Sequence, residues 1–280
     1  MRSTQNGILC PGCRKLISAD EPRCPHCGIT RPGSLLKNNP LSRWLADPNQ
    51  LIRSIIYVNA GMFLLSLLLR PESTRLSMNP LLFLSPGTHS LLLFGASGTL
   101  PIDQLGRWWS LLSANYLHGG ILHIVFNMLA FRQIAAFTVR EYGVHRMFVL
   151  FTLGGIAGFL VSYLAGVSLT IGSSAAVCSL IGAALYYGKS RGGIYGQAVY
   201  KQIGGWAVAI FLFGLLVPGI NNWGHGGGMA AGALLAFLMG YREKKPETAF
   251  HRLAAWGCGI ATVLVLLYAV VAAFSSLFSR

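Results

Sequence analysis

Charged side chains are scarce in this sequence, and acidic ones are the scarcest. Only 11% of the 280 residues are charged, and 8 aspartates and glutamates stand against 22 lysines and arginines. A soluble domain usually carries about 25% charged residues. This deficit, together with a hydrophobic content of 53%, argues against a soluble protein and predicts one that contacts lipid.

Acidic residues are absent from every apolar run that is long enough to cross a bilayer. The absence excludes an aspartyl intramembrane protease, which needs a pair of carboxylates, and a proton-coupled transporter, which needs a carboxylate relay. The sequence also lacks the HExxH motif of membrane metalloproteases. The chemistry of this chain therefore has to come from neutral polar groups.

Apolar runs of about 17–25 residues predict an all-α, polytopic membrane protein. The first run begins near Leu51, too far along the chain for a cleavable signal peptide, so we expect it to be retained as an anchor. The expected helices cover residues 53–70, 118–139, 145–166, 171–188, 202–218, 222–241 and 253–277.

Basic residues are distributed unevenly between the expected loops. If the N-terminus is inside, the inside segments carry 17 lysines and arginines and the outside segments carry 4. The positive-inside rule then predicts an inside N-terminus and, for seven spans, an outside C-terminus. We expect a bacterial inner membrane protein. The formal net charge of +14 is thus explained by topology, and no nucleic-acid partner is expected.

The connection over residues 71–117 is long and contains apolar stretches too short to span, at 81–84 and 91–94. It ends in the pair Trp108 and Trp109, which suits the headgroup level of a bilayer. We therefore expect this loop to lie in the outer membrane interface.

Four cysteines form two CxxC turns near the N-terminus, Cys10 to Cys13 and Cys24 to Cys27. Four thiolates from two such turns favour a structural zinc site. Two disulfides are the alternative, but the expected topology places these residues in a reducing compartment. We expect a zinc ribbon-like segment over 1–33, a linker over 34–50, and possible docking of a cytoplasmic protein partner. The two cysteines left over, Cys178 and Cys258, are expected to pack in apolar helices.

Neutral polar residues open three of the expected helices. All three helices run from outside to inside in the expected topology, so their first residues share one depth below the outer surface. The residues are His118, His123 and Asn127; Ser173 and Ser174; and Asn221, Asn222 and His225.

This set suits acyl transfer by a serine. Ser174 needs a base, and His225 is the candidate. His123 and Asn127 are four residues apart, hence on one face of a helix, from which both can donate to an oxyanion. Because no acid is available, a Ser–His dyad is expected rather than a triad. The alternative is that Ser174 is only a small packing residue, which would leave the matching depth of the histidines unexplained.

Small residues recur along two of these helices, at Gly224, Gly228 and Gly232 in one and from Gly172 through Ala176 to Ala184 in the other. Small residues let membrane helices approach closely. The pattern predicts that the helix over 222–241 presses His225 against Ser174.

Three motifs in order resemble the rhomboid intramembrane serine proteases over about residues 51–241. The segment from His118 through His123 to Asn127 is similar to the family's HxxxxHxxxN helix, Gly172-Ser173-Ser174-Ala175 to GxSG, and His225 to Gly232 to HxxGxxxG. The resemblance implies a six-helix core, here followed by a seventh helix within 242–280. It implies cleavage of transmembrane protein substrates in the lipid bilayer, without a catalytic cofactor.

The same resemblance assigns roles to single residues. It implies Ser174 as nucleophile, His225 as base, and an oxyanion hole made by His123, Asn127 and the Ser174 backbone N–H. His118 is implied as a supporting residue.

Three positions depart from the family pattern: Ala175 stands where the family has glycine, Cys178 where many members carry an aromatic residue, and Ser110 where an arginine often follows the tryptophan. No departure removes a catalytic group. The alternative function is an inactive rhomboid-like protein that binds or escorts membrane helices, although such a binder has no need of the complete set of site residues. A transporter is a more distant alternative.

Overall fold

The computed structural model describes residues 7–34 except 12 and 14, then 47–69, 75–76 and 83–278. The chain divides into two compact units, Met1–Ser54 and Ile55–Arg280. Most of the linker expected over 34–50 lies outside the described residues. Its last three residues, 48–50, are not linker but the first turn of a helix.

The first unit contains a small antiparallel hairpin of β1 (Gly7–Leu9) and β2 (Leu16–Ser18), in which Ile8 is opposite Ile17. An isolated bridge pairs Arg23 with Thr30. The small hydrophobic core of this unit is a cluster of Ile17, Cys10 and Cys24. So small a core needs a further cross-link to be stable.

Long helices occupy all seven positions expected from the apolar runs, which confirms the mainly helical fold. In the described part of the chain they are α2 (Pro48–Leu68), α5 (Ile121–Tyr142), α6 (Val144–Leu164), α7 (Ser174–Arg191), α8 (Gly193–Leu216), α9 (Asn222–Met239) and α10 (Ala249–Phe278).

Several helix starts differ from the expectation. α2 begins at Pro48 rather than residue 53, α10 at Ala249 rather than residue 253, and α5 at Ile121 rather than residue 118, so His118 precedes its helix. α7 begins at Ser174 rather than residue 171, which leaves Gly172 in an extended loop with φ of +120°. α8 begins at Gly193 rather than residue 202, because Gly192 and Gly193 turn the chain with φ of +65° and +63°. The loop expected between these helices is therefore a tight turn, and residues 194–201 are helical.

Five of the seven helices are long and apolar enough to cross a membrane: α2, α5, α6, α8 and α10. α7 and α9 are not among them, since small and polar residues lower their hydropathy. Most of α7 is buried against other helices rather than exposed to lipid. That α7 and α9 also span the bilayer stays a prediction.

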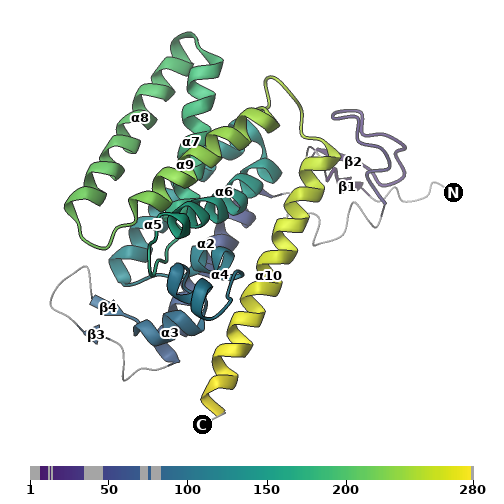
Figure 1. Cartoon of the computed structure of the whole chain (residues 1–280). Coiled ribbons are helices and arrows are strands. Elements are labelled where there is room, and N and C mark those ends of the chain that lie inside the picture. The colour runs from purple at the N-terminus through teal and green to yellow at the C-terminus, as the bar shows by residue number, and fades with distance from the viewer. Residues whose placement is uncertain are drawn as a thin grey trace. The chain divides into compact units, whose positions relative to one another are not determined.

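Within the second unit, α7 is central and packs on α9, α6 and α8, as Figure 1 shows. The α7–α9 contact is close enough to exclude side chains. A Cβ atom added at Gly228 would lie 2.2 Å from the Ala175 carbonyl oxygen, and one at Gly232 would lie 1.9 Å from that of Ser179. The close approach predicted from the recurring small residues is thus confirmed.

The connection before α5 is folded rather than irregular. Its elements are β3 (Arg75–Leu76), β4 (Phe83–Ser85), α3 (Thr88–Leu93), the π-helical turn η3 (Leu100–Gln104), α4 (Ser110–Ser113) and the 3₁₀ turn η4 (Ala114–Tyr116). A bridge between Ser97 and Thr170 joins it to the segment that precedes α7. Backbone hydrogen bonds to this connection therefore hold the segment before Ser174 in place.

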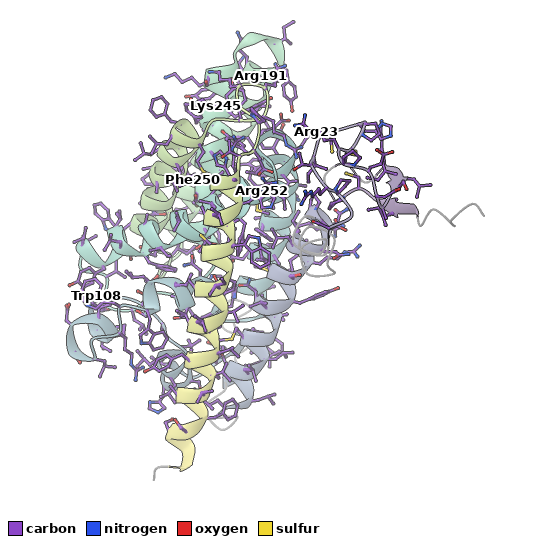
Figure 2. All side chains as sticks on the ribbon, turned by 90° about the vertical axis from the view of Figure 1, so that its right-hand side faces the viewer. Arg23, Trp108, Arg191, Lys245, Phe250 and Arg252 are labelled. Carbon is purple, nitrogen blue, oxygen red and sulfur yellow. The ribbon has the colours of Figure 1, made fainter. Side chains whose placement is uncertain are left out.

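The loop between α9 and α10 folds onto the start of α6. The Glu247 carboxylate accepts the backbone N–H groups of His145 and Arg146 at 3.0 and 3.1 Å. The buried Arg146 guanidinium donates to the carbonyl oxygens of Lys245 and Pro246. Figure 2 shows Lys245 and Arg191 at one end of this unit and Trp108 toward the other.

Candidate active site

Ser174 and His225 meet where the first turns of α7 and α9 lie side by side. The Ser174 Oγ is 2.9 Å from the His225 Nε2. Ser174 is the first residue of α7, so its backbone N–H is one of the free donors at a helix start. The structure therefore places a hydroxyl, an imidazole and a backbone donor together, as the sequence predicted.

The protonation of His225 follows from its neighbours. If Nε2 accepts the Ser174 hydroxyl hydrogen, the neutral ring carries its proton on Nδ1. Among the described residues, no hydrogen-bond partner reaches this Nδ1. Among the described residues, no carboxylate therefore orients the ring through Nδ1.

His123 presents a donor toward Ser174. Its Nδ1 accepts the Gly119 backbone N–H at 3.2 Å, so the neutral ring carries its proton on Nε2. A Cβ atom added at Gly172 would lie 2.7 Å from this Nε2 and 3.6 Å from the Ser174 Oγ. The absent side chain of Gly172 thus lets the His123 ring approach the backbone just before Ser174.

Asn127 and His118 have different hydrogen-bond partners. The Asn127 amide nitrogen donates to the His123 carbonyl oxygen at 2.9 Å, which leaves one amide hydrogen for another acceptor. In the described residues no hydrogen bond joins Asn127 to Ser174. The buried His118 Nε2 is 3.4 Å from the Ser173 Oγ, and its ring is edge-on to His123 with centroids 5.0 Å apart.

The departures near Ser174 are accommodated by the helix. Ala175 is the second residue of α7, where the backbone does not need glycine, and it packs with Ala114 and Phe159. Cys178 is also buried, with 1% of its surface exposed. Position 178 thus carries a small buried thiol in place of an aromatic ring.

Arg107, which the sequence analysis did not single out, tethers the loop in which Ser110 replaces the family's usual arginine. Arg107 donates to the Leu92 carbonyl oxygen at 2.7 Å, and its guanidinium carbon lies 6.0 Å from the centre of the Trp109 ring. Ser110 instead contacts the Ser97 hydroxyl at 3.3 Å. An arginine just before paired tryptophans is a signal that could have pointed to this role.

The sequence model described as the Rhomboid domain matches residues 105–242. We call this stretch, just under half of the chain, the rhomboid domain. It is 33% identical over 156 residues to the rhomboid protease GluP of Bacillus subtilis, which covers 56% of this chain and 31% of GluP. It is 32% identical over 163 residues to RHOMBOID-like protein 4 of Arabidopsis thaliana, 58% of this chain and 41% of that relative.

A third relative, RHOMBOID-like protein 5 of Arabidopsis thaliana, is 31% identical over 174 residues, which are 59% of this chain and 55% of its own length. The chain thus spans about a third to a half of these relatives. The rhomboid domain and the apolar helices together show a multi-pass integral membrane protein. All the candidate catalytic residues, from His118 to His225, lie inside the domain.

The cysteine cluster lies outside the rhomboid domain, and its geometry fits a metal ion. The Sγ atoms of its four cysteines all lie within 4.8 Å of one another, with Cys10 to Cys27 at 3.6 Å and Cys13 to Cys24 at 3.7 Å. Zn–S bonds of about 2.3 Å in a tetrahedron place two sulfurs about 3.8 Å apart. All four thiols are unbridged by disulfides, so the donor set suits zinc.

Proposed function

We propose that this protein is an intramembrane serine endopeptidase in which Ser174 is the nucleophile and His225 the general base. The observation that carries the proposal is the 2.9 Å contact between the Ser174 Oγ and the His225 Nε2. A serine used only for packing does not need an imidazole aligned with its hydroxyl. The rhomboid domain and its named protease relatives support the same reaction class.

The reaction follows from these atoms. His225 takes the hydroxyl proton while the Ser174 Oγ attacks a peptide carbonyl carbon, and the carbonyl oxygen becomes an oxyanion. His123 Nε2–H, the second Asn127 amide hydrogen and the Ser174 backbone N–H stabilise that charge. The C–N bond then breaks as His225 gives the proton to the leaving amine. Water, deprotonated by His225, hydrolyses the remaining ester and restores the serine.

The substrates of this proposal are single-span membrane proteins, cut near the outer face of a bacterial inner membrane. The asymmetry of basic residues supports an inside N-terminus and an outside C-terminus. Arg191 and Lys245 lie at the end of the helical unit away from Trp108 (Figure 2). Ser174 opens α7, whereas Arg191 ends it, so the nucleophile faces the end without these basic residues.

A cleavage assay tests the proposal. The purified chain is reconstituted into liposomes with a panel of single-span proteins, beside Ser174→Ala and His225→Ala variants. We expect wild-type protein to cleave at least one substrate close to one end of its membrane helix, and both variants to be inactive. Equal cleavage by the Ser174→Ala variant would overturn the proposal. Stable substrate binding without cleavage would favour the helix-binding alternative.

We also propose that Cys10, Cys13, Cys24 and Cys27 hold one structural zinc ion, which supplies the cross-link that the small ribbon needs. The test measures bound metal by mass spectrometry in full-length protein purified without chelator. We expect about one zinc per chain, and a loss of zinc in a Cys10→Ser, Cys24→Ser double variant. Cys258→Ser is the control and should keep its zinc. A metal-free wild-type chain would contradict this assignment.

A further inference from the structure

The His225 ring has few restraints of its own. In a catalytic triad, a carboxylate bonded to Nδ1 holds the imidazole in orientation. Here Nδ1 has no hydrogen-bond partner among the described residues. The position of the imidazole relative to Ser174 therefore depends on how the first turn of α9 is anchored.

That turn is anchored through Asn221, the N-cap of α9. Its side-chain oxygen accepts the Gly224 backbone N–H at 2.9 Å. Its backbone carbonyl accepts the backbone N–H of His225 at 3.1 Å. One residue thus fixes both the start of the helix and the main chain of the base.

The amide nitrogen of Asn221 reaches two other elements. It donates to the Ser162 Oγ, near the end of α6, at 2.6 Å and to the Thr170 Oγ1 at 2.9 Å. Both hydroxyl residues are buried, so these hydrogen bonds are shielded from water and costly to lose. Thr170 precedes Ser174 by four residues. Its backbone N–H donates to the Ser97 carbonyl oxygen, and its carbonyl oxygen accepts the Ser97 N–H.

We propose that Asn221 is a positioning residue that sets the distance and angle between His225 and Ser174. It links the main chain that carries the base to the segment that carries the nucleophile, a role that an acid bonded to the imidazole plays in triads. This inference rests on the proposed protease function and names the group that orients its base.

Three substitutions separate this bridge from simple helix capping. Serine is a good N-cap but is too short to bridge to α6 and Thr170. Alanine removes both the cap and the bridge. Aspartate keeps the cap and can accept hydrogen bonds from the two hydroxyls, at a helix start that favours negative charge. Asn222 is the matched control, because its amide donates to the Phe211 carbonyl oxygen of α8 instead.

The first measurement is the rate at which a fluorophosphonate probe labels the reconstituted full-length protein. A misplaced catalytic group typically costs about a hundredfold in rate, so we expect Asn221→Ser and Asn221→Ala to label roughly 10–100-fold more slowly. Asn221→Asp should stay within about threefold of wild type, and Asn222→Ser likewise. Wild-type labelling by Asn221→Ser would overturn the inference.

The second measurement does not require a reactive serine. Diethyl pyrocarbonate modifies accessible imidazoles, and the extent at His225 is read by mass spectrometry against His26. We expect His225 to react several-fold faster in Asn221→Ser than in wild type or Asn221→Asp, because the released ring leaves Ser174. Equal rates in all variants would contradict the bridge. If wild-type protein resists fluorophosphonate, the protease proposal fails, while this measurement still decides the role of Asn221.

Discussion

The two ends of the helical unit are built from different chemistry. Where α6 begins, Glu247 pairs with His145 at 3.1 Å and accepts two backbone N–H groups, and Arg191 pairs with Glu243 at 2.9 Å. Around Ser174, the side chains that meet are imidazoles, hydroxyls and amides, all uncharged in the proposed resting state. We call these the charged end and the site end.

The difference shows what each end can do. Paired charges at helix starts and loops hold the bundle together and suit an aqueous boundary. A neutral cluster costs less at membrane depth than a buried carboxylate, and in the proposed mechanism it supplies the nucleophile, the base and the oxyanion donors. The site end has no triad acid, so its proposed activity depends on the relative positions of Ser174 and His225. We therefore expect activity to be more sensitive to small displacements at the site end than at the charged end.

Apart from the dyad residues themselves, the largest effect on activity should come from Gly172→Ala. The added methyl would clash with the His123 ring, and losing one oxyanion donor typically costs about a hundredfold in rate or more. Cleavage and fluorophosphonate labelling measure the loss. Gly166→Ala is the control, since Gly166 also has positive φ, +80°, but nothing lies near the added atom. A similar loss in both variants would show that backbone strain alone is responsible.

At the charged end, Glu247→Ala should lower stability rather than activity per folded molecule. It removes two backbone hydrogen bonds and an ion pair from a mostly buried carboxylate, which should cost about 2–3 kcal/mol. Unfolding in mild detergent measures it. Glu243→Ala breaks a more exposed pair and should cost under about 1 kcal/mol. Equal costs would remove the distinction between the two pairs.

The same carboxyl predicts a pH dependence. Burial raises the pKa of Glu247, but the His145 hydrogen bond and charge and the Arg146 backbone N–H outweigh it and hold the pKa below its ordinary 4.5. A depressed folded-state pKa stabilises the protein above pH 4.5, and that contribution is lost as pH falls through the folded pKa. Melting temperatures of wild type and Glu247→Gln should therefore converge on acidification. Parallel curves would contradict this role.

The smallest effect is expected for Ala175→Gly, which restores the residue usual in the family. Because Ala175 has an ordinary helical backbone in α7, glycine brings no conformational benefit and costs up to about 1 kcal/mol of stability. Labelling rates should change less than about threefold on the same grounds. A large gain in rate would mean that the methyl group obstructs the site.

Much of this architecture could be predicted from the sequence, because apolar length and small-residue spacing are local signals. They located the seven helices and the approach of α9 to α7 through Gly228 and Gly232. The start of α8 was not predicted correctly, because the pair Gly192 and Gly193 is compatible both with a long loop and with a tight turn. The matching depth of His118, Ser174 and His225 predicted the site residues, whose catalytic roles stay a proposal.

The contacts that hold the site were not predictable in the same way. An asparagine before a helix suggests an N-cap, so the capping role of Asn221 could have been predicted from the sequence. Its bonds to Ser162 and Thr170 depend on where α6 and the segment before α7 come together in space. The Arg107 tether and the pairing of Ser97 with Thr170 likewise arise from tertiary packing.

The most direct test of the account is to map the site of fluorophosphonate modification by mass spectrometry in reconstituted wild-type, Ser174→Ala and His225→Ala proteins. A Ser174–His225 dyad predicts a single adduct on Ser174 in wild type and none in either variant. An adduct on another serine, or unchanged labelling of Ser174 without His225, would contradict the dyad.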